Sequence, residues 1–408
     1  MWWYNIGIGA FTLGIRIAAC WKPKARLWIE GRRGLLEKMA ATITSDEPLV
    51  WVHAASLGEF EQGRPVIEAI RATHPGYKIL LTFFSPSGYE VRKTYAGADY
   101  VFYLPSDSPR HVRRFLDIAK PSVAIIIKYE FWLNYLAELG RRGCPTYLIS
   151  AIFRRDSVFF RPYGSAFRRA LRVFSKIFVQ NTASKELLAN IGVTHVEVAG
   201  DTRFDRVAKI AEAARRLEIV DRFCGGRKVF VAGSTWAPDE ELLMRLIRTC
   251  PEQQFIVAPH EMEQERIERL LAAAGERGIR YTDCERGASP EGKQLLVIDT
   301  IGILSSVYAY ASMAYIGGGF GVGIHNILEA ATFGLPLAFG PNYGKFREAV
   351  ELVDLGAAKS ISCYEELEAW FSQLIADESL REKLGAAAVR YVHENCGATE
   401  QIVHEIFG

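Results

Sequence analysis

The stretch WVHAASLGEFEQG, residues 51–63, contains the two patterns from which the fold can be predicted. An apolar run ends at His53, small residues follow, and a helical pattern begins near Gly58. This order is typical of one strand-to-helix step in a parallel sheet covered by helices. It also places a carboxylate, Glu59, at the edge of the sheet where such folds bind ligands.

The same alternation of short apolar runs and helical patterns continues along the whole chain, which predicts an α/β protein with parallel sheets. In the first half we expect strands at 48–53, 78–83, 99–103, 122–127, 145–149, 176–180 and 195–199. In the second half we expect them at 228–232, 253–258, 294–298, 313–317, 335–339 and 358–361. Residues 364–376 and 378–393 are expected to be helices. The series restarts near residue 205, so we expect two Rossmann-like domains, at 26–205 and 206–408.

The charge of the chain is unevenly distributed between its two halves. Residues 1–200 carry 27 basic and 16 acidic residues, whereas residues 201–408 carry 22 and 31, for a net charge of +2. The basic first half suits an anionic partner such as a phosphorylated substrate or a membrane surface. The alternative is that the difference in charge between the two halves arose by chance drift between domains. The seven cysteines form no CxxC pair, so we expect neither a zinc site nor a disulfide framework, and a reducing compartment fits best.

The N-terminal segment, residues 1–25, is uncharged as far as Arg16 and begins with interfacial aromatic residues, Trp2, Trp3 and Tyr4. The uncharged stretch is shorter than the roughly 20 residues that a spanning helix needs. Basic residues follow it, so we expect a shallow membrane anchor on the cytoplasmic side. An ordinary buried helix and a cleaved signal ending near Cys20 are the alternatives.

The stretch YIGGGFGVGIHNILE, residues 315–329, indicates a nucleotide site in the second domain. Glycines let a ligand approach the backbone, and a helix beginning near His325 and Asn326 would offer free N–H groups to a phosphate. Glu329 follows Asn326 by one helical turn, where its carboxylate can accept hydrogen bonds from ribose hydroxyls. A glycine-rich turn with a capping Asn and Glu is the alternative. The strings GSTW (233–236), APH (258–260) and DTIG (299–302) also follow expected strands and would line the same sheet edge.

In the first domain, Glu59 can act as a general base if a hydroxyl is positioned beside it. A first-turn Glu that merely complements the helix dipole, which stabilises the anion, is equally compatible with the spacing. Lys128 and Glu130 follow strand 122–127 and would reach the same edge. His53 could orient Glu59, bind substrate or only pack. The arginine clusters at 110–114, 154–161 and 168–172 suit phosphate groups, although each alone is typical of a solvated face.

These strings together resemble the Kdo transferases, the 3-deoxy-D-manno-octulosonic acid transferases of lipopolysaccharide synthesis. The resemblance rests on HAASLGE (53–59), SPSGYE (85–90), YLPSDSP (103–109), YEFWLN (129–134), AGDTRFD (199–205), GSTW, APH, DTIG and GGGFGVGIHNILEAA (317–331). It runs in order along nearly the whole chain.

The resemblance implies a GT-B fold, with two Rossmann-like domains facing across a cleft, and an inverting, metal-independent glycosyltransferase without a cofactor. The implied reaction transfers Kdo from CMP-Kdo to a lipid A precursor at an anionic membrane surface, the cytoplasmic face of the inner membrane, with no nucleic acid involved. The implied catalytic base is Glu59. Acceptor-side candidates are His53, Ser56, Gly58, Lys128, Glu130 and Arg154. Donor-side candidates are Gly233, Ser234, Thr235, Pro259, His260, Gly318, Gly319, Gly323, His325, Asn326 and Glu329.

The chain departs from the family pattern at Lys128, where an acidic residue is usual, at Leu133, where Pro is usual, and at Ile152, where Arg is usual. All three lie on the acceptor side and bear on which acceptor is used and how many sugars are added. Three other functions remain open: a glycosyltransferase for another nucleotide sugar, a nucleotide-sugar epimerase, and a two-lobed binding protein without catalysis. The oligomeric state does not follow from the sequence.

Overall fold

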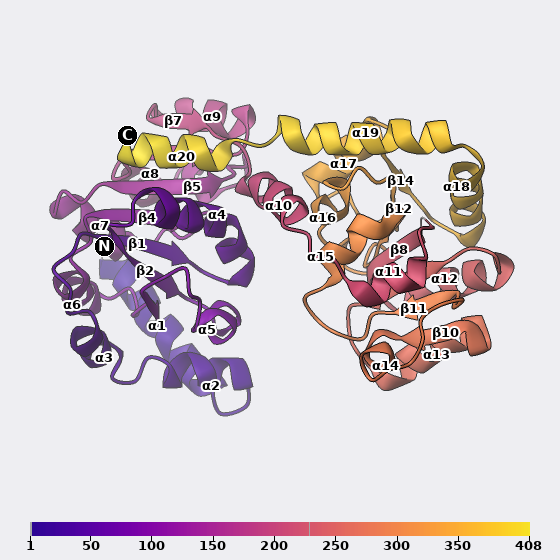
Figure 1. Cartoon of the computed structure of the whole chain (residues 1–408). Helices are drawn as coiled ribbons and strands as arrows, with labels where there is room; N and C mark the ends of the chain where they lie inside the picture. The colour runs from indigo at the N-terminus through magenta and orange to yellow at the C-terminus, as the bar shows by residue number, and fades with distance from the viewer. Residues whose placement is uncertain (1, 228) are drawn as a thin grey trace. The chain divides into compact units, whose positions relative to one another are not determined.

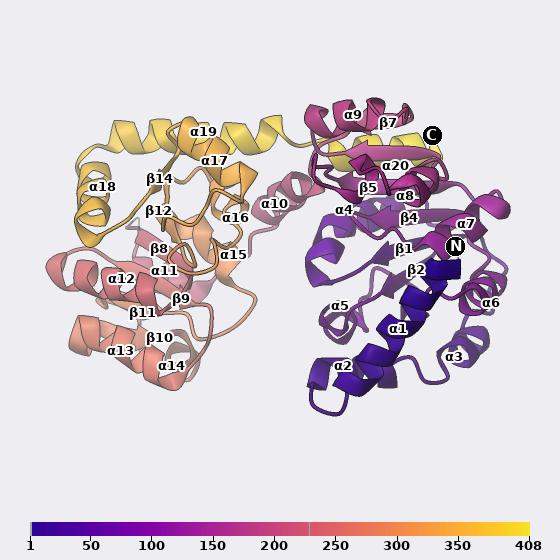
Figure 2. The same cartoon turned by 180° about the vertical axis from the view of Figure 1, so that it is seen from behind.

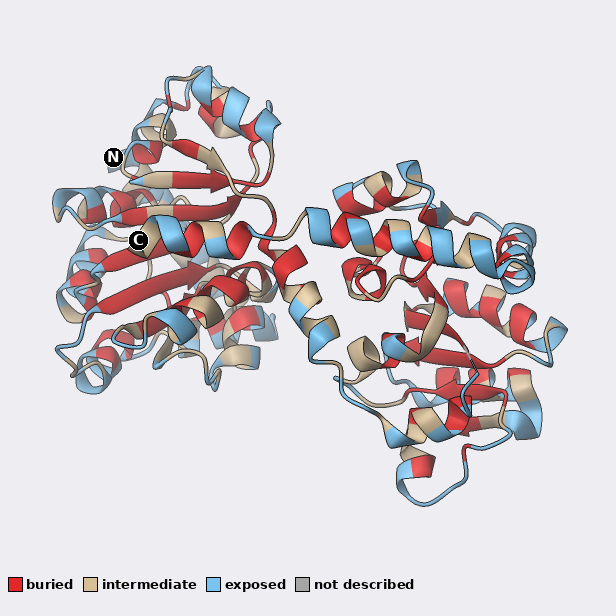
Figure 3. Ribbon diagram, turned by 45° about the horizontal axis from the view of Figure 1, so that its top comes forward, coloured by how far each residue is buried: buried red, intermediate tan, exposed pale blue. Residues whose placement is uncertain are grey.

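The computed structural model describes residues 2–227 and 229–408, so Lys228 at the start of the expected strand 228–232 lies outside it. The chain divides into two units, each built around one parallel sheet (Figure 1). Unit 1 is the chain up to Asp205 together with Cys396–Gly408, and unit 2 is Arg206–Asn395. In both, the strands are mostly buried because helices cover the sheets, which explains their continuous apolar runs (Figure 3).

The sheet of unit 1 has the strand order β3-β2-β1-β4-β5-β6-β7. Its strands are β1 (Leu49–Ala54), β2 (Lys78–Phe83), β3 (Tyr100–Tyr103), β4 (Val123–Ile127), β5 (Thr146–Ala151), β6 (Lys176–Val179) and β7 (Val196–Val198). Its helices are α1 (Trp2–Ala18), α2 (Pro23–Glu30), α3 (Leu35–Thr42), α4 (Leu57–Thr73), α5 (Pro86–Arg92), α6 (Pro109–Ala119), α7 (Leu133–Arg141), α8 (Ser165–Leu171), α9 (Thr182–Ala189) and α20 (Ala398–Phe407), and α10 (Thr202–Glu212) crosses the boundary between the units.

The sheet of unit 2 has the strand order β10-β11-β9-β8-β12-β13-β14. Its strands are β8 (Val229–Thr235), β9 (Phe255–Pro259), β10 (Gly278–Arg280), β11 (Leu295–Val297), β12 (Ala311–Ile316), β13 (Leu337–Phe339) and β14 (Ala358–Ser360). Its helices are α11 (Glu218–Cys224), α12 (Ala237–Thr249), α13 (Gln264–Ala274), α14 (Tyr281–Glu285), α15 (Leu304–Val307), α16 (Leu328–Ala331), α17 (Arg347–Asp354), α18 (Tyr364–Ala376) and α19 (Glu378–Glu394). The sequence missed β10, a three-residue edge strand.

In each sheet, two neighbouring central strands are followed by strands that are added on opposite sides of the pair. The place between these two central strands is the topological switch point, where folds of this kind bind ligands. In unit 1 this point lies between β1 and β4, where His53 is paired with Ile126. In unit 2 it lies between β8 and β12, where Gly233 is paired with Ile316. The strand order therefore brings the loops after β1 and β4 together in one unit, and the loops after β8 and β12 together in the other.

The C-terminal helix α20 belongs to unit 1, which corrects the expectation that all of 206–408 forms the second domain. Its Ile402 and Val403 are buried in the core formed by β1, β2 and α4. Asp205 holds the start of this helix, because its carboxylate accepts hydrogen bonds from the N–H groups of Gly397 and Thr399 at 2.6 and 2.7 Å. The apolar pattern of α20 predicts a helix but does not indicate which sheet it covers.

Helix α1 lies on the surface of unit 1, and none of its 17 residues is buried (Figure 2). Its N-terminal end is attached by polar contacts: the Tyr4 hydroxyl donates to Asp107 at 2.6 Å, and Asn134 donates to Asn5 at 2.9 Å. No helix in the described residues combines the length and the apolar character that crossing a bilayer requires. The expected shallow anchor is not tested by this finding and stays a prediction.

Candidate functional site

The loop after β1 positions Glu59 at the switch point of unit 1. Helix α4 begins at Leu57, and the Glu59 side chain in its first turn turns back so that one oxygen accepts the Ala55 N–H at 2.6 Å. The hydroxyl of Ser56, the residue before the helix, makes no such capping bond. The Ala55 contact fixes the carboxylate beside the sheet edge.

Burial of the Glu59 carboxylate is the largest influence on its pKa, which is raised above that of an ordinary Glu. The neighbouring Glu130 carboxylate raises it further, while the Ala55 N–H, His53 and Lys128 act in the opposite direction. Desolvation therefore outweighs the stabilisation that the helix start was expected to give the Glu59 anion. A carboxylate with a raised pKa is a stronger base towards a hydroxyl proton.

His53 is fully buried and contacts Glu130. Its Nδ1 lies 2.9 Å from Thr82 Oγ1, and its Nε2 lies 3.3 Å from Glu130 Oε2. Nδ1 also lies 3.1 Å from the carbonyl oxygen of Thr82, and Trp51 donates to the Thr82 hydroxyl at 2.8 Å. One ring nitrogen of His53 therefore faces Thr82 and the other faces Glu130. His53 is therefore a buried support for the second carboxylate.

Glu130 receives a further donor from its own loop, because Trp132 Nε1 donates to Glu130 Oε2 at 2.7 Å. Sequence reasoning identified Glu130 but missed Trp132 and Thr82. The only signal in the sequence was position: Trp132 closely follows Glu130, and Thr82 lies shortly before the string SPSGYE (85–90).

The remaining acceptor-side candidates have different surroundings. Lys128 has a left-handed backbone with φ of 62°, and Ser150 on the adjacent strand has φ of 56°. Strained non-glycine residues of this kind cluster at functional sites. A Cβ at Gly58 would meet no atom within 4 Å, so packing does not require glycine there and open space lies beside Glu59's turn. Arg154 is exposed in the loop after β5.

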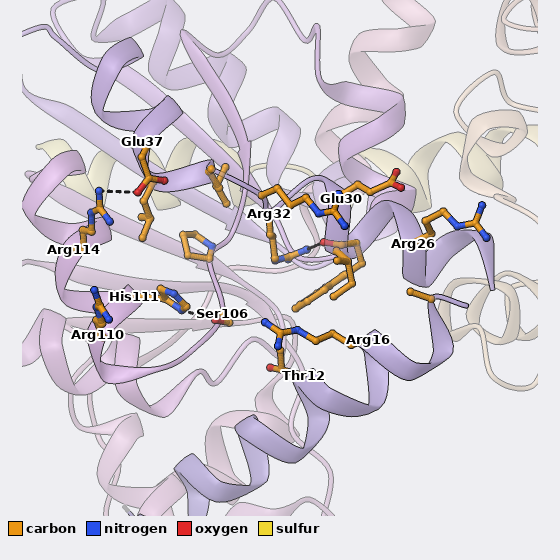
Figure 4. Close-up of a pocket in the computed structure, with 18 of the residues that line it drawn as sticks. Thr12, Arg16, Arg26, Glu30, Arg32, Glu37, Ser106, Arg110, His111 and Arg114 are labelled. Atoms are coloured by element: carbon orange, nitrogen blue, oxygen red, sulfur yellow. Dashed lines mark hydrogen bonds and ion pairs between the residues drawn. The ribbon is translucent and has the colours of Figure 1, made fainter. Parts of the chain in front are cut away.

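A basic pocket with a volume of about 1050 Å³ lies beside α1 in the same unit. Figure 4 shows Thr12 and Arg16 on one side of this pocket and Arg110, His111 and Arg114 on the other. Of the arginine cluster at 110–114, Arg113 does not line the pocket and donates to the Pro109 carbonyl instead. The sequence did not predict that α1 would form a wall of this pocket.

In unit 2, three rings stack at the switch point: Trp236 after β8, His260 after β9 and His325 after β12. The ring centroids of His260 and His325 are 4.3 Å apart, and Trp236 Nε1 donates to His325 Nε2 at 2.8 Å. Burial and then His260 lower the pKa of His325 to about 4, so this imidazole is neutral at pH 7. Since Nε2 accepts, its proton is on Nδ1, which can donate to a ligand.

Asp239 connects the two loops of this switch point and is fully buried. Its carboxylate accepts the N–H groups of Trp236 and Gly318 at 2.8 and 2.9 Å and the hydroxyl of Tyr315 at 2.8 Å. The glycine-rich turn is thus held by a side chain from α12. Gly318 has φ of 93°, a conformation that favours glycine, and a Cβ at Gly317 would lie 2.3 Å from the Ser234 carbonyl oxygen.

Asn326 and Glu329 lie together as expected, since Asn326 Nδ2 donates to Glu329 Oε1 at 2.9 Å. The helix after the glycines begins only at Leu328 and has four residues, so the expected helix start at His325 and Asn326 is wrong. Without a longer helix, the backbone of the glycine turn and the side chains must provide the donors.

The other donor-side candidates divide into two groups. Ser234 is half-buried and has a strained backbone with φ of 54°. His260 is exposed and directly follows Pro259, the last residue of β9. Thr235 instead donates to Glu240 at 3.0 Å, and Glu240 pairs with Arg266 at 2.6 Å, so its hydroxyl is used by the fold. Packing also accounts for three of the glycines, because a Cβ would clash at Gly233, Gly319 and Gly323.

Comparisons with known proteins identify relatives of this chain. A family model described as 3-deoxy-D-manno-octulosonic-acid transferase matches residues 28–206. In an alignment 427 positions long, the chain is 28% identical to the 3-deoxy-D-manno-octulosonic acid transferase of Bordetella pertussis, covering 97% of this chain and 98% of that one. The chain is 26% identical over 406 residues to the enzyme of the same name from Rickettsia typhi, and this match covers 96% of this chain and 86% of that one.

Among solved structures, UDP-GlcNAc 2-epimerase from Neisseria meningitidis bound to UDP-GlcNAc is similar, with a TM-score of 0.62 and 15% identity over 88% of this chain and 99% of that one. At this identity the likeness shows the fold alone. It confirms the predicted fold class, two Rossmann-like units of the GT-B type.

The raised pKa of Glu59 can be measured by carbon NMR of carboxyl-labelled glutamate, with the resonance assigned from its loss in Glu59→Gln. We expect Glu59 to titrate above the ordinary Glu value of about 4.3. Replacing Glu130 by Gln removes a negative neighbour, so the Glu130→Gln variant should show a lower Glu59 pKa. The exposed Glu252→Gln is the control and should leave it unchanged. A Glu59 that titrates at or below the ordinary value would contradict this description of the site.

Proposed function

We propose, because this chain is similar to Kdo transferases over nearly its whole length, that it transfers Kdo from CMP-Kdo to a lipid A precursor during lipopolysaccharide synthesis. The observation that carries the proposal is the Glu59 carboxylate, half-buried near a second carboxylate at the switch point of unit 1, with its pKa raised by desolvation and then by that neighbour. The family match covers residues 28–206, which include both carboxylates.

In the proposed reaction Glu59 removes the proton of the acceptor hydroxyl as its oxygen attacks the anomeric carbon of Kdo. The bond from that carbon to the phosphate of CMP breaks, CMP leaves with the electron pair, and inversion at the anomeric carbon follows from attack on the opposite face. Glu130 is held by His53 and Trp132 and keeps the pKa of Glu59 raised. We propose that the reaction needs no metal ion or cofactor.

In unit 2, the donor-side residues fit the two ends of a nucleotide. Asn326 orients Glu329, whose carboxylate can accept from ribose hydroxyls, while the Nδ1–H of His325 can donate to a phosphate. Fixed donors aimed at a leaving group stabilise the charge that develops on it. An epimerase shares the fold, but the sequence relatives favour a transferase.

The catalytic role of Glu59 is tested by mass spectrometry of the product formed from a lipid A precursor and fresh CMP-Kdo, in buffer containing a chelator. We expect wild type to add Kdo, and Glu59→Gln to be slower by about 10²–10⁴-fold, the usual contribution of a general base. The control is Glu68→Gln on the same helix, whose partly exposed pair with Arg64 contributes little. Turnover of Glu59→Gln within a few-fold of wild type would remove the base from the mechanism, and a requirement for added metal would overturn the metal-independent part.

The ribose contact is tested by calorimetry with CMP and 2′-deoxy-CMP, after a thermal-shift comparison of CMP, UDP and GDP. Wild type should bind CMP about tenfold more tightly than 2′-deoxy-CMP, because the deoxy ligand leaves a polar group of the site unpaired. Glu329→Ala should remove this preference, while the exposed Glu382→Ala should keep it. If Glu329→Ala still prefers CMP to 2′-deoxy-CMP, the ribose is bound by other residues. If UDP raises the melting temperature more than CMP does, a different nucleotide sugar is the favoured donor.

We also propose that the protein acts at the cytoplasmic face of the inner membrane, with α1 lying on the bilayer. Trp2, Trp3 and Phe11 are exposed on this helix, and Arg16 and Lys22 follow. In co-sedimentation with anionic vesicles, we expect the double variant Trp2→Ser/Trp3→Ser to bind several-fold more weakly than wild type. Tyr163→Ser, an equally exposed aromatic position outside α1, serves as the control. Equal binding of all three proteins would exclude α1 as the contact.

A further inference from the structure

An apolar groove with a volume of about 530 Å³ runs along α1 on unit 1. Tyr4, Ile8 and Phe11 of α1 line one side of the groove, and Phe131, Val158 and Phe167 are among the residues that line the rest. Ile8 is half-buried there, whereas its neighbour Ile6 is 61% exposed and does not line the groove. A groove with so apolar a lining favours an apolar occupant.

The groove leads to the candidate catalytic site, because Glu130 and Trp132 also belong to its lining. Glu130 Oε2 accepts from both Trp132 and His53, and its charge raises the pKa of Glu59. A molecule lying in the groove would therefore contact Glu130, the second of the two carboxylates. The groove is thus connected with the chemistry and is not a separate surface feature.

The basic pocket and the apolar groove share α1 as a common wall. Residues 4, 8 and 11 of the helix line the groove, whereas 12, 16 and 19 line the basic pocket. Within the described parts of the chain, Arg16 and Arg110 at that pocket have no carboxylate partner, while Arg114 pairs with Glu37 at 2.9 Å (Figure 4). An apolar slot beside unpaired cations is complementary to an amphiphile that carries both acyl chains and phosphate.

We propose that the groove binds one acyl chain of the lipid that accepts the sugar, and that α1 is the wall that recognises it. The inference rests on the proposed function and extends it by assigning the acyl contact. A docked protein helix fits the groove less well, because a helix is about 10–12 Å across and a volume of this size would hold roughly one turn. An acyl chain is thinner and unbranched, and it fits a slot that ends beside the headgroup chemistry.

The first experiment compares kcat/KM for two acceptors that share the phosphorylated headgroup, one with full-length acyl chains and one with shortened chains. Ile8→Trp fills the groove and should lower kcat/KM for the long-chain acceptor about tenfold, the effect of excluding roughly two methylene groups. It should leave the short-chain acceptor within about twofold of wild type. The matched control Ile6→Trp places the same side chain on the same helix outside the groove and should change neither value.

The second experiment needs no turnover. An analogue of the acceptor with a photoreactive diazirine at the end of one acyl chain is irradiated with the protein, and the labelled peptides are identified by mass spectrometry. We expect label within residues 4–11 and 157–167, and we expect Ile8→Trp, but not Ile6→Trp, to reduce it at least several-fold.

The outcomes separate this inference from the proposed function. If wild type transfers no Kdo but the label still lies in the groove, the function fails and the lipid site stands. If transfer occurs but Ile8→Trp and Ile6→Trp lose activity equally on both acceptors, the groove proposal is overturned. Label confined to Trp2, Trp3 and Trp21 would also overturn it, because it would indicate contact with bulk membrane only.

Discussion

The arrangement of unit 1 depends on one contact, the hydrogen bond between the buried His53 ring and the half-buried Glu130 carboxylate. An imidazole with no exposed surface must be neutral or paired, since burying an isolated charge is costly. Thr82, which also accepts from Trp51, contacts one nitrogen of the ring, and Glu130 contacts the other. That contact fixes a carboxylate at the end of β4 next to the carboxylate at the end of β1. The proximity of the two, together with burial, distinguishes Glu59 from an ordinary first-turn glutamate.

In unit 2, as in unit 1, hydrogen bonds to one buried side chain hold the two loops of the switch point together. Asp239 is buried at the start of α12 and accepts three hydrogen bonds from the loops after β8 and β12 and from Tyr315. A carboxylate held by several donors is a rigid connection, since removing one partner leaves a buried polar group unpaired. In both units a buried side chain thus joins the two loops of the switch point by hydrogen bonds within the protein. Such preorganisation is what an enzyme needs at charged groups of a transition state.

Most of the architecture could be predicted from the sequence, because parallel strands buried on both faces appear as continuous apolar runs. β10 was missed because a three-residue edge strand containing Arg280 lacks that pattern. The placement of α20 was wrong because its partners, Asp205 and the core around α4, are distant in the chain. The role of His53 stayed open for the same reason, since its partners are 29 and 77 residues away. The positions of Glu59, Glu130, Asn326 and Glu329 were accessible because each follows a strand, but the balance of burial against helix dipole at Glu59 required coordinates.

The central claim is that Glu59, and no other carboxylate, receives the proton of the acceptor. A crystal structure of Glu59→Gln with CMP-Kdo and the lipid acceptor would show which side chain faces the attacking hydroxyl. The account predicts that this hydroxyl lies about 2.6–3.2 Å from the side-chain oxygen at position 59, the distance that direct proton transfer requires. A hydroxyl that instead contacts Glu130, with position 59 still bonded only to Ala55, would contradict it.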